Sequence, residues 1–117
     1  MTPREIAEKL DMQVLSSGAC MDNEITLGIC SDLLSWVMAH GKKDGMWITI
    51  QTHINTIAVA SLLELSCIII SGGAQADPKT IDKAREEGIT LLASGLTSYE
   101  LASRLYALGV GLNDKEQ

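Results

Sequence analysis

The chain has 117 residues, of which 15 are acidic and nine are basic, and its formal net charge is −6. This length fits one domain and leaves no room for two. The acidic balance argues against nucleic acid as a partner, because binding to phosphates needs clustered lysine and arginine, and the only adjacent basic pair is Lys42-Lys43. Phenylalanine is absent, so we expect an aliphatic core.

The cysteines and the longest apolar runs indicate where the protein resides. Cys20, Cys30 and Cys67 are odd in number and include no Cys-x-x-Cys spacing, and the charged first ten residues do not look like a secretion signal. We therefore expect a cytoplasmic protein with reduced thiols. No apolar run approaches the roughly 20 residues that cross a bilayer, so no membrane association is expected.

The N-terminus indicates a helix followed by a strand. Thr2 can cap the helix, Pro3 suits its first turn, and Glu5 completes a capping box. A short strand is expected over 12–15, followed by a polar connection over 16–24.

From Ile25 onward the sequence alternates between strand and helix patterns. We expect strands over 25–29, 47–50, 67–70 and 90–93. We expect helices over 32–40 (capped by Ser31), 55–65, 78–87 (opened by Asp77 and ended by Gly88) and 99–108 (with a second capping box, Thr97 and Glu100). The continuous apolar run 67–70 is typical of a strand that is covered on both faces.

This alternation predicts the fold class. Successive strand–helix–strand units imply right-handed crossovers and a mostly parallel sheet. We expect a single α/β domain, a three-layer sandwich with about five strands and helices on both faces. The domain should span 1–112, with 113–117 as a frayed tail.

Two of the expected helices are apolar around most of their circumference. One contains Leu33, Leu34, Trp36, Val37 and Met38, and the other covers the stretch 56–63. A surface helix in a small domain normally keeps one polar face, so each needs a second surface to pack against. Either the N-terminal segment covers these helices or they form a homodimer interface, which we favour.

The carboxyl ends of parallel strands are where open α/β sheets bind ligands. The residues expected there to bind a ligand are Gln51, Thr52, His53, Asn55, Ser71, Gly72, Gly73 and Ser94. Backbone N–H groups of 71–73 could hold phosphate or carboxylate oxygens, which favours a small polar or phosphorylated effector. The alternative is structural, because turns and caps need the same residue types in every α/β protein.

Catalytic and metal motifs are missing from the sequence. The Gly-Lys at Gly41-Lys42 lacks the upstream glycine of a P-loop, and no dinucleotide-binding glycine pattern opens a helix. His40 stands at an expected helix end, and His53 has no surrounding nucleophile motif. The cysteines and histidines are too dispersed for a zinc site. We therefore expect no enzyme activity, cofactor or metal.

The sequence also resembles a known family, the DRTGG domain, over nearly its whole length. The resemblance is carried by the stretches 47–53, 55–65 and 67–73, and it continues through Asp77-Pro78, Gly88-Ile89 and 91–102. Ser71-Gly72-Gly73 matches the family's Thr-Gly-Gly with serine in place of threonine. His53-Ile54 stands where the family has Asp-Arg, which is a departure.

The resemblance implies a compact α/β accessory module. Members of this family accompany CBS domains in regulated pyrophosphatases, occur in phosphotransacetylases, and resemble the N-terminal domain of the HPr kinase/phosphorylase. There the domain serves oligomer contacts or regulation, and in the pyrophosphatases it accompanies control by adenine nucleotides. The hypothesis is a homodimeric regulatory module that binds such an effector. The alternative is a ligand-free adaptor that docks on a protein partner through its apolar helices.

Overall fold

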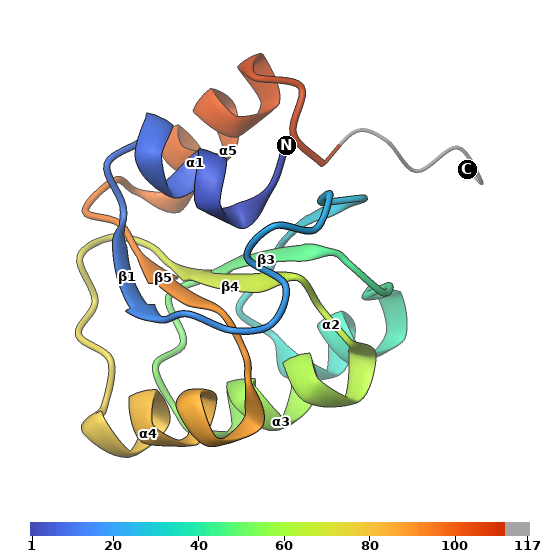
Figure 1. Cartoon of the computed structure of the whole chain (residues 1–117), viewed down its shortest axis with the longest axis vertical. Helices are drawn as coiled ribbons and strands as arrows, with labels where there is room; N and C mark the ends of the chain where they lie inside the picture. The colour runs from blue at the N-terminus through green and yellow to red at the C-terminus, as the bar shows by residue number, and fades with distance from the viewer. Residues whose placement is uncertain (112–117) are drawn as a thin grey trace.

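Residues 1–111 are described in the computed structural model of the protein, where one sheet lies between two layers of helices (Figure 1). In chain order the elements are α1 (Pro3–Lys9), β1 (Gln13–Ser16), β2 (Gly28–Cys30), α2 (Leu34–His40), β3 (Met46–Thr49), α3 (Asn55–Leu63), β4 (Cys67–Ile70), α4 (Pro78–Glu87), β5 (Leu91–Ala93) and α5 (Ser98–Ala107). The tail expected over 113–117 lies outside the described residues.

Within residues 1–111 the sheet has five strands, in the order β1-β5-β4-β3-β2. The pairs β2–β3, β3–β4 and β4–β5 are parallel, whereas β1 runs antiparallel to β5, with Gln13 opposite Ala93. The three-layer α/β fold with a mostly parallel sheet is therefore confirmed. The antiparallel edge strand brings the start of the chain next to its last strand.

Two apolar clusters hold the layers together. On one face, α1 and α5 place Ile6, Leu101 and Leu105 against Ile48 and Ile69 of the sheet. On the other face, α2, α3 and α4 pack against alternate residues of the same strands (Figure 1); this cluster includes Val37, Ile57, Ala84, Trp47 and Ile68. Because α1 lies on the face opposite α2 and α3, the N-terminal helix does not cover these two apolar helices.

Local signals account for several element ends. The Thr2–Glu5 capping box forms as predicted, α4 begins after Asp77 and ends at Gly88, and β4 occupies the predicted 67–70. Thr97 caps α5, but the carboxylate of Glu100 pairs with Arg104 rather than completing a box.

Two predicted elements begin two or three residues later than expected. The strand expected over 25–29 begins only at Gly28, because the N–H groups of Ile25 and Thr26 donate to Met1 and Asp44 instead of pairing with β3. The helix expected from residue 32 begins at Leu34, and no side chain caps it. The carboxylate of Asp32, its predicted first residue, instead accepts hydrogen bonds from Thr49 of β3 and from Ile50.

The helix expected over 55–65 ends at Leu63, because Glu64 adopts a left-handed conformation with φ of 56°. Only glycine takes this conformation without a steric cost, and a carboxylate is also unfavourable beside a helix C-terminus. We expect Glu64→Gly to raise the free energy of unfolding by about 1 kcal/mol, measured by urea denaturation. The exposed Glu86→Gly, inside α4, should instead lower it by about 1 kcal/mol; a loss at both positions would contradict this account.

No helix within residues 1–111 is long and apolar enough to span a membrane.

Candidate functional site

The carboxyl ends of β2 and β3 are joined by a hydrogen-bond network around Asp32. One Asp32 carboxylate oxygen accepts from the Thr49 hydroxyl and from the Ile50 N–H, each at 2.9 Å. The Gln51 side-chain amide donates to the Asp32 carbonyl at 3.0 Å. Gln51, one of the predicted ligand contacts, therefore serves the structure at this edge, and Asp32 organises the edge.

The next three predicted residues form the turn that leads into α3. The His53 ring nitrogen Nδ1 accepts the Asn55 N–H at 3.1 Å, and the Thr52 carbonyl accepts the Thr80 hydroxyl at 2.8 Å. His40 is similarly engaged, with its Nδ1 at 2.9 Å from the Trp36 carbonyl oxygen. Neither imidazole forms a hydrogen bond to a hydroxyl or thiol of residues 1–111.

Residues 71–73 were expected to offer backbone donors to a ligand, but their N–H groups already have acceptors within the fold. The N–H groups of Ser71, Gly72 and Gly73 donate to the carbonyls of Thr49, Leu96 and Ser94, respectively, at 2.6–3.0 Å. Gly72 and Gly73 have φ values of 69° and 71°, which favour glycine. The turn therefore fastens the ends of β3, β4 and β5 together, and its own donors are used.

A hollow at this edge lies between β1, β5 and the connection from β4 to α4. We call it the β1–β5 pocket, and its volume is about 390 Å³. It is lined by Asp11, Gln13, Leu15, Gly73, Ala74, Gln75, Ala76, Ile81, Ala93, Ser94 and Gly95.

Of the eight predicted ligand contacts, the β1–β5 pocket includes Gly73 and Ser94. Gln51, Thr52, His53, Asn55, Ser71 and Gly72 lie outside its lining. Three polar side chains of the pocket, those of Asp11, Gln13 and Gln75, were not predicted from the sequence. Asp11 and Gln13 enter the site because β1 pairs with β5, and a pairing partner cannot be read from the periodicity of a strand.

Within residues 1–111, no three His, Cys, Asp or Glu side chains are grouped as a metal site requires. Burial, with a smaller contribution from nearby Cys20, raises the pKa of Cys67 to about 12. Partial burial and the Asp32 carboxylate raise the pKa of exposed Cys30. Thiols whose pKa is raised are poor nucleophiles.

The chain is similar in sequence to one protein family and in fold to a solved structure. The family model described as "DRTGG domain" matches residues 5–108. Among solved structures, the chain is similar to the CBS and DRTGG domains of the regulatory region of Clostridium perfringens pyrophosphatase, complexed with the activator diadenosine tetraphosphate. The TM-score is 0.69 at 15% identity, over 92% of this chain and 46% of that one. The chain thus spans less than half of that structure. No curated protein matches it.

Proposed function

This chain belongs to the DRTGG domain family, and from that premise we propose that it is a non-catalytic, cytoplasmic regulatory module that forms a homodimer and responds to a small polar effector. The observation that carries the proposal is an exposed apolar surface on two neighbouring helices, α2 and α3. The engagement of both histidines by backbone groups and the raised pKa values of Cys30 and Cys67 support a non-catalytic role.

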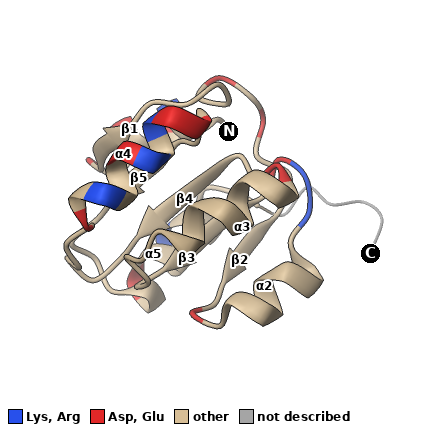
Figure 2. Cartoon of the chain, turned by 90° about the horizontal axis from the view of Figure 1, so that it is seen from below, with Lys and Arg blue, Asp and Glu red and all other residues tan. Residues whose placement is uncertain are grey.

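The α2–α3 surface is apolar and uncharged. Leu33, Trp36 and Met38 are 62%, 44% and 40% exposed at α2, and Leu62 of α3 is 70% exposed. Figure 2 shows neither acidic nor basic residues on these two helices, whereas α4 beside them carries both. Large apolar side chains exposed on helices without charged residues are typical of an interface that is buried in an assembly.

A nucleotide is the effector class that the comparisons support best. The structurally similar regulatory region was solved with a diadenosine tetraphosphate activator, and an adenine nucleotide is accordingly the first class to test here. In a thermal-shift screen, a nucleotide at one hundred times its Kd should stabilise the fold by about 2.7 kcal/mol. A folded protein that responds to no nucleotide, nucleoside or phosphorylated metabolite would contradict the sensing role.

The homodimer is tested by a charge on the α2–α3 surface. We expect Leu62→Glu to raise the dimer dissociation constant at least about 30-fold, since a charge forced into the centre of an interface costs about 2 kcal/mol or more. Sedimentation velocity at several concentrations measures the change. The side chain is largely exposed in the single chain, so the fold should tolerate the substitution.

A matched control lies on the opposite layer. Tyr106 of α5 is 67% exposed, and Tyr106→Glu should leave the dissociation constant unchanged. If Tyr106→Glu dissociates the dimer and Leu62→Glu does not, the interface lies on the other face of the sheet. A wild-type chain that is monomeric at all concentrations would overturn the homodimer. The α2–α3 surface would then favour the second candidate, an adaptor that docks on a protein partner.

A further inference from the structure

We propose that the β1–β5 pocket binds the uncharged, base-bearing part of an effector, a purine nucleoside in its simplest form, and that it excludes phosphate. This inference deepens the proposed function and rests on its premise that the domain binds a small effector. It differs from the sequence-based expectation, which placed phosphate at the glycine turn that follows β4.

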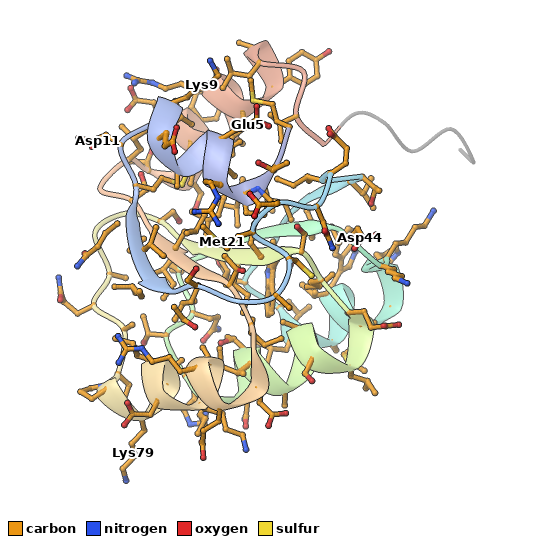
Figure 3. The ribbon with its side chains drawn as sticks, viewed as in Figure 1. Glu5, Lys9, Asp11, Met21, Asp44 and Lys79 are labelled. Carbon is orange, nitrogen blue, oxygen red and sulfur yellow. The ribbon has the colours of Figure 1, made fainter. Side chains whose placement is uncertain are left out.

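The charge of the lining excludes an anion. Among the described residues that line the pocket, Asp11 carries the only charged side chain, and there is neither lysine nor arginine. Arg85 on neighbouring α4 donates to the Leu15 carbonyl at 3.1 Å and so serves the backbone of β1. In Figure 3, Lys79 extends from α4 at the far end of the molecule from Asp11. A phosphate in the pocket would therefore meet a carboxylate, and the described lining residues provide no cation to compensate for it.

The polar side chains of the lining are available to a ligand. Within residues 1–111, the side chains of Asp11, Gln13 and Gln75 form no hydrogen bond or ion pair. Each glutamine amide presents one acceptor oxygen and a donor NH₂ group, and the ionised carboxylate presents acceptors only. A purine edge carries donors and acceptors side by side, and its amino group or a ribose hydroxyl can donate to a carboxylate.

An apolar surface lies beside these groups. Gln13 and Leu15 both line the pocket, although the register of β1 shifts between Val14 and Ser16 and interrupts its alternation. Leu15, Ile81 and Ala93 are half-buried in the lining and can pack against the flat face of a ring. The volume of about 390 Å³ lies in the lower part of the range of small-molecule sites, roughly 300–1,000 Å³. The pocket is therefore suited to a small, flat, uncharged molecule.

Calorimetry with adenosine, guanosine, AMP and ATP on the full chain tests the inference. We expect at least one purine nucleoside to bind, and its 5′-monophosphate to bind about tenfold more weakly or worse, because of repulsion by Asp11. Gln75→Ala should weaken nucleoside binding about tenfold, the effect of losing one hydrogen-bonding partner. Circular dichroism checks that the variants are folded.

A charge-matched pair of variants distinguishes the local effect of Asp11 on ligand binding from the effect of the protein's net charge. Asp11→Asn and Asp82→Asn each remove one negative charge, but Asp82 lies on α4 outside the pocket lining. Asparagine also tolerates the left-handed conformation of Asp11, whose φ is 53°. The preference for nucleoside over monophosphate should shrink several-fold in Asp11→Asn and persist in Asp82→Asn.

Two results would overturn the inference in distinguishable ways. If AMP or ATP binds as tightly as the nucleoside and Gln75→Ala changes neither, an effector binds elsewhere; the pocket assignment then fails while the sensing role stands. If no purine nucleoside or nucleotide binds at millimolar concentration, the pocket assignment fails and the nucleotide-sensing role fails with it.

Discussion

Replacing Gly18 by alanine is expected to lower the free energy of unfolding by about 3 kcal/mol. A Cβ atom at this position would lie 2.4 Å from the Gly88 carbonyl oxygen, 2.6 Å from the Thr90 nitrogen and 2.7 Å from the Ile89 carbonyl carbon. All three atoms belong to the backbone between α4 and β5, which cannot turn aside as a flexible side chain can. Overpacking of this kind costs about 1–3 kcal/mol and more where the backbone must move.

Hydrogen bonds fix the segment around Gly18 to the backbone between α4 and β5, so moving this segment away would be costly. The Gly18 N–H donates to the Thr90 hydroxyl at 3.1 Å, the neighbouring Ala19 N–H donates to the Gly88 carbonyl at 3.1 Å, and the buried Ser16 hydroxyl donates to the Ile89 carbonyl at 2.8 Å. To admit a methyl group, the segment must give up part of this set of hydrogen bonds.

Gly95→Ala is the matched control for this prediction. The space around a Cβ atom at Gly95 is open to 4 Å, and its φ is not in the left-handed range. We expect its free energy of unfolding to change by less than about 1 kcal/mol, and in the stabilising direction if at all. Urea denaturation of both variants measures the difference, and equal stabilities for the two variants would contradict the packing described around Gly18.

The second large effect concerns alkaline pH and the Cys67 thiol. Cys67 is fully buried in β4, and burial raises its pKa from 9.0 to about 12. Between these values the folded state retains a proton that the unfolded state releases, so stability is fully present below about pH 9 and falls as the pH rises toward 12. The expected loss is on the order of 1.4 kcal/mol per pH unit within this window.

Cys67→Ala isolates this titration from those of lysine and tyrosine. The variant should be less stable than wild type by a roughly constant amount below pH 9, because a small cavity replaces the sulfur. Above pH 9 the difference should shrink and then reverse, since only the wild-type chain must bury an ionising thiol or keep it protonated. Urea denaturation at pH 8, 9, 10 and 11 measures this. A difference that stays constant to pH 11 would refute the raised pKa.

The parts of the fold that the sequence predicted well are those with local causes. An uninterrupted apolar run marked β4, and Asp77-Pro78 with Gly88 marked both ends of α4, because capping and helix termination depend on neighbouring residues. The errors at β2 and α2 have distant causes. Thr26 donates its N–H to Asp44, and Asp32 turns toward β3. Each partner lies 17 or 18 residues further along the chain, so the local sequence pattern around Thr26 or Asp32 does not include it.

The candidate site shows the same contrast between features with local causes and features with distant causes. From the sequence we expected ligand contacts at the carboxyl ends of the parallel strands, and two of those residues, Gly73 and Ser94, line the β1–β5 pocket. The same expectation took glycine and serine at a strand end as donors to a ligand, whereas the N–H groups of Gly72 and Gly73 donate to the carbonyls of Leu96 and Ser94. The polar side chains of the pocket come partly from β1, whose place in the sheet depends on contacts across the whole chain.

The pairing of β1 with β5 also constrains how the chain folds. Gln13 lies opposite Ala93, so the first strand can join the sheet only after nearly the whole chain has collapsed around it. Contacts this distant in sequence carry a high loop-closure entropy and slow the folding of a domain. The parallel strands β2 to β5 and their helices can assemble from neighbouring segments first. Until β1 arrives, β5 is an exposed edge strand, and this is the stage at which a newly made chain is most prone to aggregate.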